Sequence, residues 1–201
     1  MNKELRKIAD YLLLKSSYVR DIGLFHGKMG VVVALYAYAN YYDDKILEDY
    51  AWDLLQQIYD AVYNDMPINM EYGLAGIGYG TTLLRKYGYV DCDLNAILTD
   101  IDAKIMERDP RRMTDYSVRT GLGGLQLYIA LRQEDNCPLL TFDRQYLEEL
   151  QSVMMNSEKL IPATNIIDML LEPSFSIDDY IGNPIGIDEG SAYYIIKEVL
   201  P

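Results

Sequence analysis

The most restrictive feature of this sequence is a Gly-x-x-Gly turn that occurs three times, each time directly before an aliphatic stretch. The first glycines of the three turns, Gly27, Gly73 and Gly121, lie 46 and then 48 residues apart. A near-constant interval of this size is typical of stacked helical repeats. Two glycines three positions apart at a helix start lie on one face and let neighbouring backbone approach closely. The turns therefore predict inner helices that begin at these glycines.

A fourth copy of the turn, in degraded form, is expected near residue 186. The segment Gly186-Ile-Asp-Glu-Gly190 has one residue more between its glycines, and Gly186 follows Gly121 by 65 residues. The stretch after it, 191–199, is again rich in apolar side chains. We therefore expect one α/α-repeat domain over residues 1–201, with turns near residues 27, 73, 121 and, in the degraded copy, 186.

Helix-length amphipathic segments lie between these turns. Residues 43–64, 91–108 and 143–155 place apolar side chains at spacings of three and four, which predicts one apolar face on a helix. We expect Asp93 to cap the second of these helices and Pro110 to mark its end. Alternation typical of strands is almost absent. The sequence thus predicts an all-α fold of about four hairpins, each with an amphipathic outer helix and an apolar inner helix.

Charge and composition exclude several classes of partner. The net charge is −13, because 31 acidic residues face 18 Lys and Arg residues. A nucleic-acid-binding protein needs a basic surface to neutralise phosphates, and so does a protein that docks on anionic lipid. No signal peptide or membrane-spanning stretch is recognisable, and Cys92 and Cys137 lie far apart without a Cys-x-x-Cys spacing. We expect a cytoplasmic protein with reduced thiols that binds neither nucleic acid nor membrane.

The segment Gly23-Leu-Phe-His-Gly-Lys-Met-Gly30 resembles the Gly-Leu-x-His-Gly-x-x-Gly signature of the lanthionine synthetase C-like (LanC-like) family. Residues 72–78 and 120–125 are similar to the shorter forms of that signature, and the similarity covers residues 18–132. The resemblance implies an α/α toroid, a ring of helical hairpins. This chain would supply about half of such a ring. It is therefore expected to be an open arc that caps itself, to pair with a second copy, or to be completed by a partner protein.

The resemblance also implies a zinc site in the family's cyclase members, where a lone Cys and an adjacent Cys-His pair hold the metal. That zinc activates a peptide cysteine for addition to a dehydrated residue. In this chain Cys92 precedes Asp93 and Cys137 precedes Pro138, while the single histidine is His26. The chain therefore does not supply, in the family pattern, three zinc ligands that leave a fourth coordination position open. We expect no metal site, no cofactor and no zinc-dependent cyclase activity.

His26 occupies the position of the signature histidine, and the resemblance implies a role in proton transfer. The sequence makes it the candidate catalytic acid or base. The other reading is a turn histidine that bonds a carbonyl group of the next loop, and the sequence leaves both readings open.

Several polar side chains stand at the other turns and are candidate ligand-binding residues. If the inner helices all begin at one end of the repeat array, these residues gather with His26 around one rim that suits a peptide or small ligand. Each of them can instead serve as a helix cap or a loop salt bridge. The candidates are Glu71, Tyr72, Asp115, Arg119 and Asp188.

A dense charge cluster at residues 107–112 also has two readings. Its arginines can bind a carboxylate or phosphate on a ligand. Alternatively, they can interact favourably with the negative end of a helix dipole and with nearby acidic side chains.

Three hypotheses about function follow from the sequence. The first is a non-catalytic LanC-like module that binds a peptide or a modifying-enzyme partner during maturation of a peptide natural product. The alternative is a zinc-independent enzyme that acts on a peptide or small substrate with His26 as acid or base. The third is a structural scaffold that oligomerises. The sequence leaves open whether the chain catalyses any reaction.

Overall fold

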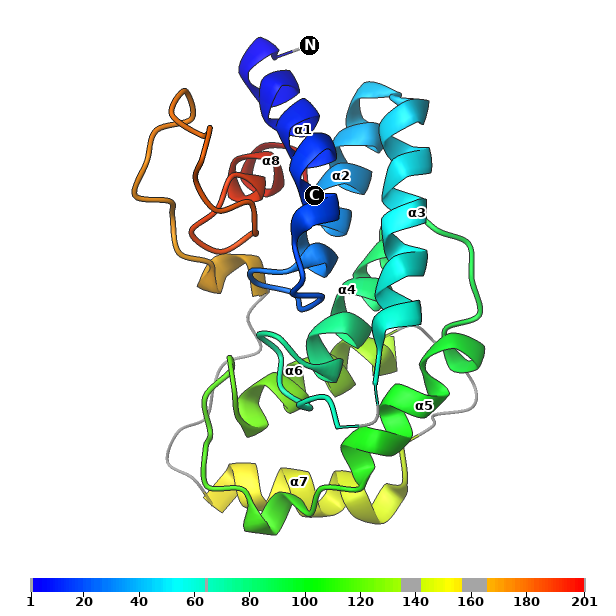
Figure 1. The fold of residues 1–201 in the computed structure, drawn as a ribbon. Helices are drawn as coiled ribbons and strands as arrows, with labels where there is room; N and C mark the ends of the chain where they lie inside the picture. The colour runs from blue at the N-terminus through cyan, green and yellow to red at the C-terminus, as the bar shows by residue number, and fades with distance from the viewer. Residues whose placement is uncertain (1, 64, 135–141, 157–165, 201) are drawn as a thin grey trace. The chain divides into compact units, whose positions relative to one another are not determined.

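The computed structural model describes residues 2–63, 65–134, 142–156 and 166–200, and all regular structure within them is helical (Figure 1). The predicted all-α class is confirmed. The chain divides into two compact units. Unit 1 consists of Met1–Asp65 with Asn165–Pro201, and unit 2 of Met66–Thr164. The closed ring and the single domain stay predictions.

Unit 1 is built around α2, which is apolar on every side. Its residues are buried without interruption from Met29 to Ala39, so neighbours must cover it all round. α1, α3 and α8 pack against it (Figure 1). The elements of unit 1 are α1 (Lys3–Lys15), η1 (Ser16–Tyr18), α2 (Lys28–Tyr42), α3 (Lys45–Ala61), η3 (Ile166–Met169) and α8 (Ala192–Val199).

The outer helix α3 shows how charge and apolar pattern together define a helix. Asp44 caps it, because its carboxylate accepts the backbone N–H of Leu47 at 3.1 Å and also pairs with Arg6 of α1. Leu47, Ala51, Leu54, Leu55 and Ile58 form the buried face. Ile46 also fits the apolar spacing of residues 43–64 but is 72% exposed, whereas the neighbouring Leu47 is fully buried.

Unit 2 repeats the plan with a second pair of hairpins. α4 packs against α5 and α6, and α7 packs against α6 and η2. Asp93 caps α5 as predicted, since its carboxylate accepts the N–H groups of Asn95 at 3.0 Å and Ala96 at 3.4 Å. The elements of unit 2 are α4 (Leu74–Lys86), α5 (Leu94–Met106), η2 (Pro110–Arg112), α6 (Leu122–Glu134) and α7 (Arg144–Asn156).

A buried polar network joins α5 to α6 in the core of unit 2. Asp102 is fully buried and accepts hydrogen bonds from the Tyr128 hydroxyl at 2.5 Å and from Arg132 Nη2 at 3.1 Å. Arg132 also donates to the Asn95 side chain at 3.0 Å. Gly78 of α4 makes room for the ring, since a Cβ there would lie 2.5 Å from Tyr128 Cζ. The buried charges of Asp102 and Arg132 therefore stabilise each other in place of water.

The Asp102→Ala variant should lose about 3–5 kcal/mol of unfolding free energy, because Arg132 would stay buried without its counter-charge. Urea denaturation followed by circular dichroism measures this loss. Asp100→Ala is the matched control, since it makes the same charge change at an exposed position of α5. Equal stability losses in the two variants would contradict a structural role for the buried pair.

Buried tyrosines are common in both units. Tyr146 of α7 is one of them, and its burial makes ionisation of the hydroxyl unfavourable. Burial raises the pKa of its hydroxyl to about 12. An unfolded tyrosine titrates near pH 10, so between about pH 10 and 12 the unfolded chain has lost a proton that the folded chain keeps. Stability must therefore fall as the pH rises through this window.

Tyr146→Phe should reduce this alkaline loss by about 1 kcal/mol between pH 9 and pH 11. Urea midpoints at the two pH values give the comparison. Tyr72→Phe, at a side chain that is 43% exposed, serves as the control and should leave the loss unchanged. A Tyr146→Phe protein that loses as much stability as the parent would contradict the assignment.

Candidate functional site

The turns that precede the four inner helices share one backbone hydrogen bond. In each, the residue after a glycine donates its N–H to the carbonyl six positions before that glycine. The four bonds are Lys28 to Asp21 at 2.9 Å, Leu74 to Pro67 at 2.8 Å, Leu122 to Asp115 at 2.9 Å and Ser191 to Pro184 at 2.8 Å. The same bond aligns Gly190, rather than Gly186, with Gly27, Gly73 and Gly121. We call these segments, 21–27, 67–73, 115–121 and 184–190, the entry loops.

Glycine is required in the entry loops by close backbone approach and not by an unusual dihedral angle. Gly27 and Gly73 have φ of −101° and −114°, which any residue adopts. A Cβ on Gly27, however, would lie 2.5 Å from the backbone nitrogen of Gly23. A Cβ on Gly190 would lie 2.5 Å from the nitrogen of Gly186. Each loop folds so tightly over its glycine that no side chain fits.

Within each unit the entry loops pair at equivalent positions. In unit 1, Asp188 donates its N–H to the carbonyl of Phe25 at 3.1 Å. In unit 2, Glu71 donates its N–H to the carbonyl of Arg119 at 3.0 Å. All four residues stand two positions before the aligned glycine of their loop. One acidic residue is therefore held at the junction of each loop pair.

The loop pair of unit 1 places a histidine beside a buried carboxylate. Asp188 is 1% exposed, and its Oδ1 accepts the backbone N–H of Leu171 at 2.7 Å. Its Oδ2 lies 3.7 Å from Nε2 of His26, whose side chain is 40% exposed. A fixed carboxylate of this kind can help to orient an imidazole. The arrangement suits proton transfer at the exposed side of the ring.

The backbone next to Asp188 is strained. Glu189 has φ of 53°, a left-handed conformation that is uncommon for residues other than glycine. Its N–H donates to the carbonyl of Leu171 at 2.9 Å. Residues 188 and 189 thus hold Leu171 through two hydrogen bonds, and this clamp fixes the buried carboxylate.

The loop pair of unit 2 presents a more exposed group of side chains. Nη1 of Arg119 lies 3.7 Å from Oε1 of Glu71, and the two side chains are 31% and 19% exposed. Tyr72 is 43% exposed, and its N–H donates to the Asn69 side chain at 3.1 Å. The Asp115 carboxylate accepts hydrogen bonds from the Thr120 hydroxyl at 2.6 Å and the Ser117 N–H at 2.8 Å. These bonds, that of Thr120 first, lower the pKa of Asp115.

The predicted site residues therefore fall into two sets. Glu71, Tyr72, Asp115 and Arg119 lie on the paired loops of unit 2, and His26 and Asp188 lie on those of unit 1. The single rim that the sequence suggests stays a prediction. Asp115 and the pair of Glu71 with Arg119 also fit the alternative reading, since they stabilise their own loops.

Sequence reasoning missed the contributions of Asn69, Leu171 and Glu189. Asn69 stands four positions before Gly73, as Gly23 does before Gly27, so aligning the turns would have drawn attention to it. Leu171 and Glu189 lie outside the segment that resembles the LanC-like family. Glu189 does stand in the degraded fourth turn, residues 186–190, that the sequence singles out. No local signal marks Leu171, because it acts through its backbone N–H and carbonyl.

Metal-ligating side chains do not gather in the part of the chain that the structure describes. Within it, no group of three or more His, Cys, Asp or Glu residues is placed to hold a metal ion. Cys92 belongs to unit 2 and His26 to unit 1, and Cys137 lies outside the described residues. Across those same residues, no helix has both the length and the apolar character that crossing a membrane demands.

The Asp188→Ala variant should lose about 1–3 kcal/mol of unfolding free energy, because the hydrogen bond from the Leu171 N–H to the buried, charged carboxylate of Asp188 would be lost. Asp188→Asn keeps an acceptor oxygen of the same shape and should lose less. Urea denaturation of both proteins gives the comparison. If the alanine variant is as stable as the parent, the clamp at residues 171 and 188 is not a structural element.

Comparison with models of known protein families finds no match for this chain, and comparison with curated proteins finds none either. The resemblance to the LanC-like family thus rests on the turn motifs themselves. The functional interpretation follows from the geometry of the entry loops.

Proposed function

We propose that the chain is a non-catalytic binding module that holds a peptide segment of a substrate or partner protein at the entry loops of unit 2. The observation that carries the proposal is the group formed by Tyr72 and the pair of Arg119 with Glu71. These side chains are partly exposed, yet they project from loops that are tied together by backbone hydrogen bonds. A rigid backbone with accessible polar and aromatic side chains is preorganised for binding, so little entropy is lost on association.

The chemistry of this group suits a peptide. Tyrosine and arginine are the side chains that most often dominate binding energy at protein interfaces. A surface ion pair at 3.7 Å contributes little stability, so either partner can exchange it for a group on a ligand. Arg119 can then bind a carboxylate, and Glu71 can bind an ammonium or guanidinium group. The net charge of −13 favours approach of neutral or basic peptides.

The biological setting suggested by the turn motifs is maturation of a peptide natural product, with a precursor peptide or a modifying enzyme as partner. The full ring of the LanC-like family is not needed for this role. The loop pair of unit 2 is complete within that unit.

The test is peptide binding by the full chain. Peptides selected from a random twelve-residue display library would be synthesised with a fluorophore, and their affinity measured by fluorescence anisotropy. Tyr72→Ala and Arg119→Ala should each weaken binding about tenfold or more, as expected for central interface residues. Tyr63→Ala, at an exposed tyrosine of unit 1, is the control. Peptides whose affinity is equal for all variants would contradict the proposed site.

A second function is favoured by one specific observation, the exposed imidazole of His26 beside the buried Asp188 carboxylate. In that alternative the chain is a zinc-independent enzyme that acts on a peptide or small substrate, with His26 as acid or base and Asp188 as the residue that positions it. His26→Gln would then abolish turnover, while the affinity for the peptide would stay within about twofold of the parent. Turnover that survives His26→Gln would exclude this role.

A further inference from the structure

The lysines of α1 differ from those of the later helices, because they have no acidic partner. Within the described residues, no carboxylate forms an ion pair with Lys3 or Lys7, both of which are exposed. The exposed lysines of α3, α4, α5 and α8 all lie close to a carboxylate. The Nζ distances are 2.9 Å from Lys45 to Glu48, 2.7 Å from Lys86 to Glu134, 3.0 Å from Lys104 to Glu107 and 3.6 Å from Lys197 to Glu172.

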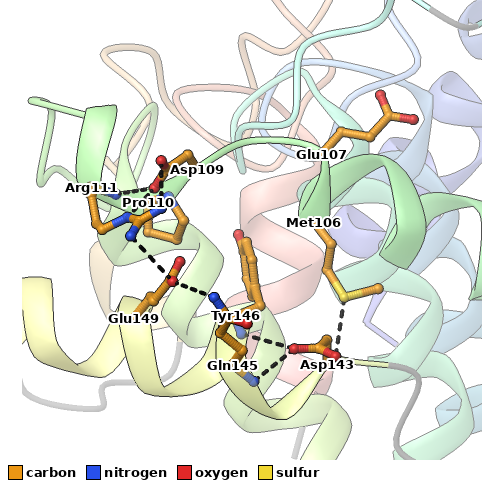
Figure 2. A pocket seen from close by; sticks show the side chains of 9 residues that line it. All are labelled: Met106, Glu107, Asp109, Pro110, Arg111, Asp143, Gln145, Tyr146 and Glu149. Atoms are coloured by element: carbon orange, nitrogen blue, oxygen red, sulfur yellow. Dashed lines mark hydrogen bonds and ion pairs between the residues drawn. The ribbon is translucent and has the colours of Figure 1, made fainter.

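The charge cluster at residues 107–112 shows the same internal pairing as these later helices. It borders a cavity of about 300 Å³ that is formed by the end of α5, the turn η2 and the first turns of α7 (Figure 2). In Figure 2, Nε of Arg111 lies 2.9 Å from Asp109, and its Nη1 lies 3.4 Å from Glu149. This pairing agrees with the interpretation in which the arginines interact with nearby acidic side chains. The unpaired lysines of α1 are therefore the more available charges.

Exposed apolar side chains stand beside these lysines on α1. Lys3, Lys7 and Leu14 are four and seven positions apart, which places them on one face of the helix. Leu14 is 64% exposed, and Tyr18, four positions later in η1, is 81% exposed. The opposite face of α1 is buried within unit 1. We call Lys3, Lys7, Leu14 and Tyr18 the basic stripe.

The neighbouring helix α3 presents the opposite charge to solvent. Ile46, Asp49, Asp53 and Asp60 recur at spacings of three, four and seven, and all are exposed. Ile46 is 72% exposed, and Trp52, which lies beside these residues, is 47% exposed. In the part of the chain that the structure describes, no Lys or Arg forms an ion pair with Asp53 or Asp60. We call Ile46, Asp49, Trp52, Asp53 and Asp60 the acidic stripe.

The two stripes match each other in charge, apolar content and length. Each combines charged residues of one sign with two exposed large apolar side chains. The helices that carry them have 13 and 17 residues, so they are about 20 and 25 Å long. Exposed apolar side chains bordered by charge mark protein contacts, and opposite charges make such contacts specific. Within one molecule α1 and α3 are neighbours whose stripes both face solvent (Figure 1). A second molecule is needed to cover them.

We propose that the chain self-associates, with the basic stripe of one copy packed against the acidic stripe of a second copy. A second copy is favoured over an unrelated acidic protein, because every molecule already carries the matching surface. An anionic lipid surface is disfavoured, since it would repel a chain with a net charge of −13. The proposal is independent of the peptide-binding role of the entry loops, because none of the stripe residues lies in them.

Sedimentation velocity of the full chain tests the proposal by measuring the average mass. At about 100 µM protein and about 50 mM salt, the average mass should exceed the 23.1 kDa of one chain. It should fall towards that of one chain at about 500 mM salt, because the charges of exposed stripes are then screened. A mass that stays at 23.1 kDa in low salt would overturn the proposal.

Charge reversal on either stripe assigns the contact. The double variant Lys3→Glu with Lys7→Glu should weaken self-association about tenfold or more, and so should Asp53→Lys with Asp60→Lys, because like charges would then face each other. An equal mixture of the two double variants should associate again, since the reversed basic stripe of one matches the reversed acidic stripe of the other. A mixture that stays monomeric would overturn direct contact between the stripes.

Matched controls make the same charge changes at exposed positions of unit 2. They are Lys86→Glu with Lys104→Glu, and Asp91→Lys with Asp100→Lys, and each should change self-association less than twofold. A loss in these controls as large as in the stripe variants would show a general charge effect and overturn the site. Circular dichroism checks that the variants stay folded, as expected for substitutions at exposed residues.

Vesicles that contain phosphatidylserine provide the last arm of the test. A monomeric chain that sediments with these vesicles, and no longer does so after Lys3→Glu with Lys7→Glu, would assign the basic stripe to a lipid surface instead. The expected result is that the chain does not sediment with the vesicles, because its net negative charge opposes that of the lipid.

Discussion

The architecture of both units depends on the backbone hydrogen bond that closes each entry loop over its glycine. The bond runs from the residue after the glycine to the carbonyl six positions earlier, and it occurs before all four inner helices. It brings the loop so close to the glycine that a Cβ there would collide with backbone atoms. Because the loop then has a defined shape, its residue two positions before the glycine can bond to the equivalent residue of a second loop. Helix entry, loop pairing and placement of the polar side chains follow from this single constraint.

Carboxylates are the second recurring element, and their surroundings decide what each can do. Asp102 is buried with a buried arginine and a tyrosine, so its role is to hold α5 against α6. Asp188 is equally buried, but the histidine beside it, His26, is partly exposed. Glu71 is partly exposed together with Arg119. The same chemical group therefore serves packing where its partner is buried, and it can serve binding or proton transfer where water reaches its partner.

Much of the local structure could be predicted from the sequence. The apolar periodicity of residues 91–108 predicted α5, and Asp93 caps that helix as expected, because capping depends on a side chain and backbone only two or three positions apart. Other features escaped prediction. Ile46 fits the apolar spacing but is exposed, since spacing does not tell which side of a helix end meets a neighbour. The register of the fourth turn was predicted from Gly186, but the loop bond places Gly190 there.

What the sequence by itself determined is the all-α class, the position of the first three turns and the absence of an adjacent Cys-His pair. These follow from residue identity and from spacings within a few helical turns. Only the tertiary structure decided which polar residues meet. The pairing of His26 with Asp188 joins residues that are 162 positions apart (188 minus 26) and rests on a backbone bond between two loops. Within the described residues the hydroxyl of Tyr146 has no hydrogen-bond partner, and the packing of α7 against η2 is a tertiary contact that no periodicity encodes.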